Sequence, residues 1–579
     1  MLAMLIGAGA AAAAEQQHST QRAAEQQHSS VDQPNFVFVL ADDLDFDYKQ
    51  DRKLIMPTLK RELADGGLQF INHVAAYPVC GPSRSSLLAS RFPHNTGYVA
   101  NGAKASVAHW SKLQNQTLGQ WFTAAGYYTA FLGKYVNGME CDVPSGWRHW
   151  GGLTCTHWNG MQLGGTYNYY NASQWQVDFD VNGTAPITHP IVPTIWSGTH
   201  QADFLGNQSL VQMRKADAEG RPFFLHVTPV MVHGGFCQGF SGMSDDWARA
   251  HLDPTDPYFE HHNPDPTIGP EGTPKGTLLT GSPCPSHAHA WDFPFLKNPH
   301  LPSWGAFANG TTPAHIAQEG DPDGTGCCDD WEADRQDHVY RNRSAAVVDL
   351  DDLLSTIFGG LDALGKRDTT YFWFSSDNGY HLGEHRLLFG KTEPYETDTR
   401  LPMYVTGPGV PKGEVRLLPT NHLDLTATIA HLGGVAKHSP HPLDGQSFAG
   451  ALTATPPAVA DWRSFSFSEF YVQQNTWRMI RLLDDDGVAN STFHWWCTNQ
   501  SEAFDLTSDA YQMNNLAGDA PSPWGKAMVD RYLSATEVLG ACVHAECHVM
   551  PPPAAASKNP LKCHDSGALL DVDEVWLDP

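Results

Sequence analysis

The chain has 579 residues, enough for one large domain with a smaller companion and for a buried active site. It carries 63 acidic and 36 basic residues, a formal net charge of −27. That balance argues against a general nucleic-acid-binding protein. It also argues against binding of long polyanionic ligands, except through a local basic pocket. No internal run of about 18 apolar residues predicts a stable membrane span in the body of the chain.

Residues 1–33 are predicted to be a signal peptide followed by a disordered leader. Met1 to Ala14 is almost wholly apolar and alanine-rich, and the polar repeat AAEQQHS occurs at residues 13–19 and again at 23–29. No basic residue precedes the apolar run, so a truncated anchor or a misassigned start is the alternative. A signal peptide would direct the chain into the secretory pathway, to the cell exterior, the cell wall or a lysosome.

Export would expose the chain to glycosylation and to disulfide formation. Eleven cysteines suit an oxidising compartment, and modification of one would leave ten, enough for five disulfides. The candidate N-glycosylation sites are Asn115, Asn171, Asn182, Asn207, Asn309, Asn342, Asn490 and Asn499.

Three short apolar runs, each followed by polar residues, predict buried parallel strands. They are Asn35–Leu40, Pro222–Thr228 and Thr370–Ser375. Helical patterns lie between them, for example at 56–66, 117–125 and 345–364. The fold class is therefore predicted as α/β, a large, mixed and mostly parallel sheet flanked by helices, with ligands bound beyond the carboxyl ends of the strands.

Residues 34–452 are predicted to form the catalytic domain. Residues 236–335 are rich in Pro, Gly, His and Asp without sustained periodicity, and are interpreted as a loop-rich insertion, either a wall of the substrate pocket or a surface excursion. Beyond a Pro/Ala-rich boundary, strand-like runs at 464–470 and 476–483 predict that residues 461–579 form a smaller C-terminal domain on an antiparallel sheet, with a loop-like tail.

Polar oxygen ligands follow two of the predicted strands. Asp42 and Asp43 end the first, and Asp377 and Asn378 end the third. Carboxylate and amide oxygens suit a hard divalent cation such as Ca²⁺ or Mg²⁺. A lone Asp-Asp pair is more often a loop or helix cap, but two strand ends on one sheet edge favour a metal site.

The segment from Val79 to Arg91, VCGPSRSSLLASR, is the most specific motif in the chain. Pro82 near the first helical turn places Cys80 at a helix N-terminus, where free backbone amides favour an anion. The alternative is a buried disulfide cysteine.

This C-x-P-S-R segment resembles that of the sulfatase family, whose maturation enzyme oxidises the cysteine to formylglycine. The family often continues with Leu-Thr-Gly-Arg, whereas this chain has Leu-Ala-Ser-Arg. The resemblance covers about residues 34–516 and implies an alkaline-phosphatase-like fold. Its further landmarks are Gly133-Lys134-Tyr135, Pro229 to His233, Ser376 to His385, Lys391, Asp424 to Thr428, Asp444 to Ser447 and Phe504 to Thr507.

The resemblance implies a sulfate ester hydrolase that binds one Ca²⁺ ion through Asp42, Asp43, Cys80, Asp377 and Asn378. The formylglycine-generating enzyme would act on Cys80 as a maturation partner, and the resulting geminal diol would attack sulfur and then eliminate sulfate. By the same resemblance, Arg84 holds the diol and the metal carboxylates, Lys134 and Lys391 neutralise the sulfate oxygens, and His233 is the candidate general acid.

One position departs from the family pattern. Many members carry a histidine two residues after the first lysine, where this chain has Val136 followed by Asn137. The Gly-Lys-Tyr-x-Asn form is closer to N-acetylglucosamine-6-sulfatase and to algal and plant arylsulfatases. Asn137 and His381 are therefore candidate partners for the diol, and His385 is a weaker one.

Two other functions remain open at this point. A phosphate or phosphonate ester hydrolase could use the same scaffold, although such enzymes usually hold two zinc ions around Ser or Thr. A non-catalytic protein that binds sulfated glycans is the second alternative. The sequence leaves the substrate open between a glucosamine 6-sulfate, another sulfated carbohydrate and an aryl sulfate, and it predicts no oligomeric state.

Overall fold

The computed structural model describes residues 33–46, 56–233, 298–317, 330–552 and 561–563, with short gaps inside the second, third and fourth ranges. The predicted signal peptide and most of the predicted 236–335 insertion therefore lie outside the described residues. Among the described helices, none is both long and apolar enough to cross a membrane.

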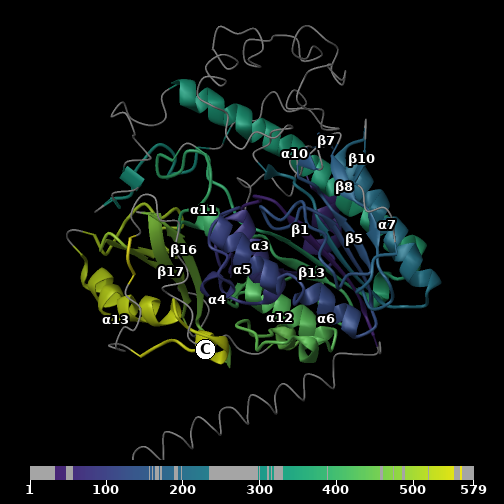
Figure 1. The fold of residues 1–579 in the computed structure, drawn as a ribbon. Helices are drawn as coiled ribbons and strands as arrows, with labels where there is room; N and C mark the ends of the chain where they lie inside the picture. The colour runs from purple at the N-terminus through teal and green to yellow at the C-terminus, as the bar shows by residue number, and fades with distance from the viewer. Residues whose placement is uncertain are drawn as a thin grey trace, which may run out of the picture.

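A nine-stranded sheet in the order β14-β2-β13-β12-β1-β11-β4-β5-β9 forms the centre of the molecule (Figure 1). The five neighbouring strands from β12 to β5 are parallel, whereas β13 and β9 run antiparallel to their neighbours. The bounds are β1 Asn35–Ala41, β2 Leu68–Phe70, β4 Tyr128–Gly133, β5 His149–Gly152, β9 Val177–Asp178, β11 Phe223–Thr228, β12 Thr370–Ser376, β13 Tyr404–Thr406 and β14 Glu414–Arg416. The predicted α/β class is confirmed.

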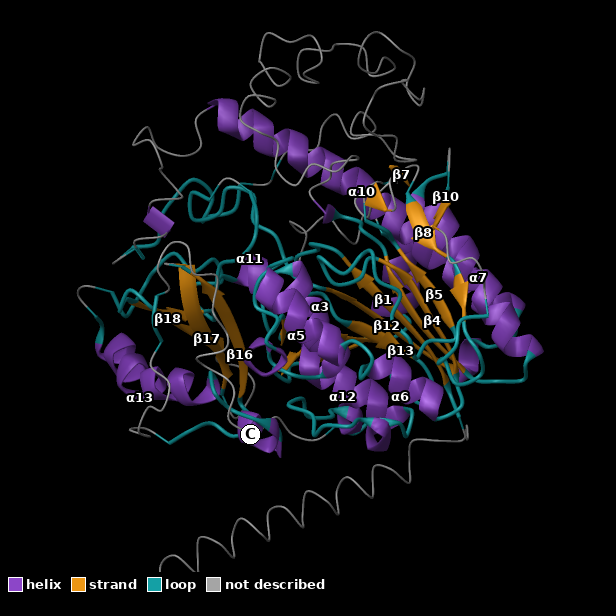
Figure 2. Cartoon of the chain, viewed as in Figure 1, coloured by secondary structure: helices purple, strands orange, loops and turns teal. Residues whose placement is uncertain are grey.

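Both faces of this sheet are buried, because β1 alternates its apolar side chains between two hydrophobic clusters. Val37 and Val39 belong to one cluster, and Phe36 and Phe38 to the other. Helices cover the two faces separately (Figure 2). The first is covered by α7 Gln201–Ala218 and α10 Asp330–Ala363, and the second by α3 Cys80–Ala89, α6 Leu118–Ala124 and α12 His422–Leu432.

A separate four-stranded antiparallel sheet forms the C-terminal part. Its strands are β16 Phe465–Val472, β17 Asn475–Leu483, β18 Asn490–Trp496 and β19 Ser501–Asp505, and α13 Pro523–Leu539 packs on one face. The antiparallel sheet predicted for this region is confirmed. The two strands predicted from sequence correspond to β16 and β17, while β18, β19 and α13 were not predicted.

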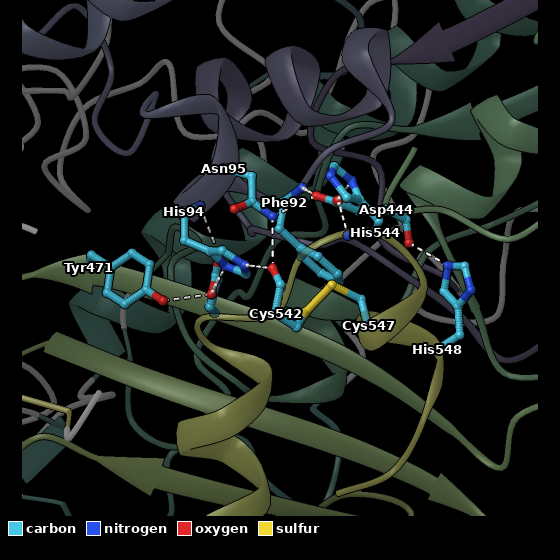
Figure 3. Close-up of a disulfide and its surroundings, with 10 residues drawn as sticks. Phe92, His94, Asn95, Asp444, Tyr471, Cys542, His544, Cys547 and His548 are labelled. Atoms are coloured by element: carbon cyan, nitrogen blue, oxygen red, sulfur yellow. Dashed lines mark hydrogen bonds and ion pairs between the residues drawn. A yellow bond between two sulfur atoms is a disulfide. The ribbon is translucent and has the colours of Figure 1, made fainter. Parts of the chain in front are cut away.

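A buried polar contact joins the C-terminal part to the part built on the nine-stranded sheet. His94, in the short helix α4 Pro93–Thr96, has its Nδ1 2.8 Å from Glu469 Oε1 and its Nε2 2.9 Å from the Cys542 carbonyl oxygen. Figure 3 shows His94 and Asn95 beside the Cys542–Cys547 disulfide. This contact ties the segment after α3 to the far end of the chain.

Three disulfides are present among the described residues, Cys141–Cys155, Cys497–Cys563 and Cys542–Cys547. Cys80 is the free cysteine of the described part. The other four cysteines lie outside it. Disulfide formation is thus confirmed, and the total of five disulfides stays a prediction.

The start of α10 differs from the prediction. Residues 330–335, predicted as the end of the loop-rich insertion, already belong to α10, and the buried apolar side chains of this helix begin upstream of residue 345 with Val339 and Tyr340. The other elements are η2 Leu59–Ala64, β3 His73–Val74, α5 Lys104–Leu113, β6 His157–Trp158, β7 Met161–Gln162, β8 Ser173–Trp175, β10 Pro193–Ile195, η7 Arg367–Thr369, α11 Glu396–Thr399, β15 Thr420–Asn421, η8 Ala436–His438, η9 Ala449–Leu452 and η11 His544–His548.

Candidate active site

The carboxyl ends of β1 and β12 bring the two predicted acidic pairs together. The strands are parallel and in register, with Ala41 opposite Ser376, so the residues that follow them are neighbours. The backbone N–H of Asp43 donates to Asp377 Oδ1 at 3.0 Å. Asn378 Nδ2 donates to Asp43 Oδ1 at 2.8 Å. Two motifs more than 330 positions apart therefore form one buried cluster.

This cluster has the donor set of a cation site. One ligand atom each from Asp42, Asp43, Asp377 and Cys80 all lie within 4.8 Å of one another, and all four residues are buried. The Oδ1 atom of Asn378 is also buried and accepts no hydrogen bond. An acceptor oxygen left free inside a protein is costly unless something binds it. Hard oxygen ligands at this density fit a calcium or magnesium ion.

Cys80 begins α3 and lies directly beside the carboxylates. Val79 precedes it in extended conformation, so Cys80 is the first helical residue, as predicted. Its Sγ atom is 3.7 Å from Asp42 Oδ1 and 3.9 Å from Asp43 Oδ1. Burial raises the pKa of the Cys80 thiol to about 12, so an unmodified thiol stays protonated at neutral pH and is a weak nucleophile.

Three cationic side chains surround the same point. Arg84 donates from Nε to Asp377 Oδ2 at 2.8 Å and lies 3.4 Å from Asp42 Oδ1. Lys134 donates to both oxygens of Asp42, at 2.8 and 2.7 Å. Lys391 donates to Asp43 and lies 2.9 Å from Cys80 Sγ. Three carboxylates thus face three cations, so a divalent cation held by the carboxylates would leave the site with a net positive charge that attracts an anion.

Lys134 directly follows Gly133, the last residue of β4, and the backbone there fixes its position. Gly133 has a φ of +120°, and a Cβ at this position would lie 2.1 Å from the Thr228 carbonyl oxygen. Only glycine lets the two strands approach this closely. The Lys134 N–H then donates to Thr228 O at 2.7 Å, and this fixes the direction in which the lysine leaves the strand.

Burial and neighbouring charges shift the pKa values of Asp42 and Asp377 in opposite directions. Burial, together with the charges of Asp377 and Asp43, raises the pKa of Asp42 despite its contacts with Lys134 and Arg84. Burial would also raise the pKa of Asp377, but Arg84 and the two lysines lower it below its usual range. A divalent cation bound beside Asp42 would lower the pKa of this carboxyl group and so favour its ionised form.

His233 comes from the loop after β11. Val232 N–H donates to the Asp42 carbonyl oxygen at 2.7 Å, and His233 Nε2 is 3.8 Å from Asp43 Oδ2. Burial lowers the pKa of His233 to about 3, since Lys134 and Lys391 offset the opposing effect of Asp43. The imidazole is therefore neutral at pH 7 in the absence of substrate.

The model of the sulfatase family matches residues 34–435 of the chain. The chain belongs to the sulfatase family. An arylsulfatase of Volvox carteri is 26% identical, over 83% of this chain and 71% of the relative. An N-acetylglucosamine-6-sulfatase of Capra hircus is 25% identical, over 84% of this chain and 80% of the relative.

A solved structure described as a complex with its substrate D-glucosamine-2-N,6-O-disulfate has the same fold, with a TM-score of 0.57 and 21% identity, over 84% of this chain and 94% of the other. The resemblance stated from sequence, to the family and to both of its branches, is confirmed. This sulfatase is a sulfuric ester hydrolase.

The additional candidates for the diol have other partners in the described part of the chain. The His381 ring pairs with Asp398, its Nδ1 2.9 Å from Asp398 Oδ2. His385 stacks on Tyr395 with ring centroids 3.8 Å apart. Asn137 is half-buried, and its carbonyl oxygen accepts from Tyr98. Val136 is fully buried in the apolar cluster. Among the described residues, the sulfatase therefore shows no contact between these side chains and Cys80.

Arg343 is a site residue that sequence reasoning missed. Its guanidinium donates to the Asp43 carbonyl oxygen at 2.6 Å and to the Val232 carbonyl oxygen at 3.0 Å. It thereby joins the loop that carries Asp43 to the loop that carries His233. Nothing local distinguishes Arg343 from the other basic residues of α10, so the sequence held no signal for it.

Asn101 was missed for the same reason. It accepts from the Gly81 N–H at 2.8 Å, one residue after Cys80. It lies in a loop with no motif around it.

The predicted glycosylation sites differ in exposure. Five are exposed: Asn115, Asn182, Asn207, Asn309 and Asn499. The Nδ2 of Asn490 donates to Asn72 Oδ1 at 3.3 Å, which occupies the atom that a glycan would need. Asn171 and the side chain of Asn342 lie outside the described part.

Proposed function

We propose that this sulfatase hydrolyses sulfate monoesters through a formylglycine made from Cys80. One observation carries the proposal. Cys80, inside its C-x-P-S-R segment, lies within 4 Å of Asp42 and Asp43 and 2.9 Å from Lys391 at the start of a helix. The hydrated aldehyde would supply one hydroxyl that attacks sulfur and a second whose deprotonation releases sulfate. Neither serine nor cysteine carries that second hydroxyl.

We also propose that one Ca²⁺ ion binds Asp42, Asp43, Asp377, Asn378 and modified Cys80. The clustered carboxylates and the free Asn378 Oδ1 support it. When bound, the ion would lower the pKa of the attacking hydroxyl and draw charge from the sulfate oxygens. Arg84 holds two of the carboxylates in place through its contacts with Asp377 and Asp42.

Lys134 and Lys391 are proposed to bind the sulfate group. Both ammonium groups lie beside Cys80's carboxylate neighbours in a buried site, where charge contacts are stronger than in water. His233 is proposed to protonate the leaving oxygen. Its pKa is low without substrate, and the negative charge of a bound sulfate ester would raise it toward the working range.

The proposed substrate is a sulfated carbohydrate such as a glucosamine 6-sulfate, with aryl sulfates as the second candidate. The two named relatives carry these two activities in their names, and the structural neighbour was solved with a sulfated glucosamine. The formylglycine-generating enzyme would be the partner during maturation. The secretory pathway, extracellular or lysosomal, fits the disulfides and the exposed sequons.

The test combines peptide mass spectrometry across Cys80 with assays on protein coexpressed with a formylglycine-generating enzyme. We expect an aldehyde in place of the thiol, release of sulfate from an aryl sulfate or glucosamine 6-sulfate, and loss of at least about 10³-fold in kcat for Cys80→Ala. A phosphate monoester serves as the control substrate. Dominant phosphate release, or an unmodified thiol with full sulfatase activity, would contradict the proposal, and tight binding of a sulfated sugar without turnover would favour the non-catalytic alternative.

A further inference from the structure

Thr392, immediately after Lys391, has a backbone conformation that a β-branched residue rarely adopts. Its φ is +111°. Non-glycine residues persist in this region only where their surroundings hold them, and such residues gather at functional sites. The position matters because Lys391, the preceding residue, extends to Cys80 Sγ and Asp43.

The groups that hold Thr392 come from β17 of the C-terminal sheet. Trp477 Nε1 donates to the Thr392 carbonyl oxygen at 2.9 Å. Asn475 Nδ2 donates to Thr392 Oγ1 at 3.2 Å and to Glu393 Oε1 at 2.9 Å. Asn475 and Trp477 are two positions apart on one strand, so both side chains leave the same face, and both are buried.

The far side of the turn is fixed as well. Glu393 N–H donates to Asp398 Oδ2 at 2.9 Å, and Thr392 Oγ1 donates to Glu393 Oε1 at 2.9 Å. Every polar group of Thr392 with a described contact therefore faces Glu393 or β17. Rotation of the Thr392 backbone would break the Trp477 bond and redirect the lysine before it.

We propose that β17 is a positioning element of the active site, in which Trp477 and Asn475 hold Thr392 in its strained conformation and so aim Lys391 at Cys80. The inference rests on the proposed function, because it takes Lys391 to act on the bound sulfate. It makes the C-terminal sheet part of the catalytic machinery as well as a packing partner of the core.

The matched pair Trp477→Phe and Trp496→Phe tests it. Each substitution removes one indole N–H and keeps an aromatic ring. Trp496 lies directly opposite Trp477 on β18, is equally buried, and its Nε1 is 3.3 Å from Glu502 rather than near the lysine. We expect Trp477→Phe to lower kcat by about 10- to 100-fold through misplacement of Lys391. Trp496→Phe should stay within about twofold of wild type.

A double-mutant cycle with Lys391→Ala separates positioning from general packing. If Trp477 acts through Lys391, Trp477→Phe should change kcat by less than about twofold in the Lys391→Ala background. Asn475→Ala should follow the same pattern, so the test survives if one tryptophan variant folds poorly. An equal loss of kcat with and without Lys391, or no loss for either β17 variant, would overturn the inference. Inactivity of the wild-type enzyme would instead count against the proposed function.

Discussion

At the scale of single residues, the site depends on groups whose chemistry burial has changed. Burial raises the pKa of the Cys80 thiol to about 12 and lowers that of His233 to about 3. Neither side chain in that state is a strong nucleophile or acid at neutral pH. In the proposed mechanism, Cys80 acts only after its conversion to formylglycine, and His233 acts only once a bound substrate adds its negative charge.

If His233 is the general acid, as proposed, its contribution should depend on the leaving group. A sugar alkoxide is a poor leaving group and needs a proton, whereas a nitrophenolate does not. We therefore expect His233→Gln to lower kcat/KM for a sugar sulfate by about 10²- to 10⁴-fold and for nitrophenyl sulfate much less. Steady-state kinetics on the two substrates give the ratio. Equal losses on both would assign His233 to substrate or metal binding instead.

At the scale of elements, the order of the strands in the sheet brings most of the site residues together. β1 lies between β11 and β12, and β4 lies beside β11. The carboxyl ends of these four parallel strands deliver Asp42, His233, Asp377 and Lys134 to one sheet edge, where α3 adds Cys80. The same element-level logic joins α4 to the C-terminal sheet, through His94 and Glu469.

The contact between His94 and Glu469 should make stability depend on pH. Burial lowers the pKa of His94, but Glu469 and the Cys542 carbonyl more than offset this, so the pKa is raised. Both ring nitrogens face acceptors, which fits the protonated form. A raised pKa means that the stabilisation is complete below the unfolded value of about 6.5 and is lost as pH rises through the folded value.

We expect His94→Gln to lower the free energy of unfolding by about 3 kcal/mol at pH 6, with the deficit shrinking as pH rises. Urea unfolding at several pH values measures it. His548→Gln is the matched control in the same region (Figure 3). Burial lowers the pKa of His548, so its contribution is present above the unfolded pKa and is lost as pH falls. Parallel pH slopes for the two variants would contradict the assignment.

At the scale of the whole molecule, the proposed calcium ligands come from distant parts of the chain. Asp42 and Asp43 follow β1, Cys80 begins α3, and Asp377 and Asn378 follow β12. The unfolded chain does not hold them together. A cation bound here must therefore stabilise the folded state by mass action.

Chelation of calcium should lower the melting temperature of the whole protein. At a free calcium concentration 100 times its Kd, the loss would be about 2.7 kcal/mol of unfolding free energy, and added calcium should restore it. Differential scanning calorimetry with EDTA and with calcium measures the shift. The Asp43→Asn, Asp377→Asn double variant should show no calcium-dependent shift. A shift of full size in that variant would place the calcium elsewhere.

The sequence by itself determined the parts whose signal is local. The apolar runs at 35–40 and 370–375 predicted buried strands, and Pro82 placed Cys80 at a helix start, because strand burial and the preference of proline for the first helical turn act over a few residues. The α/β class and the C-terminal antiparallel sheet were predictable from such apolar runs, and the family was predictable from short motifs such as C-x-P-S-R.

Only the tertiary structure decided which residues meet. It paired His381 with Asp398 instead of Cys80, brought Arg343 of α10 to the backbone of Asp43, and set Trp477 of β17 against Thr392. These partners are 17, 300 and 85 positions apart. Their contacts follow from the packing of whole elements, and no pattern within any one segment records where a distant element will lie.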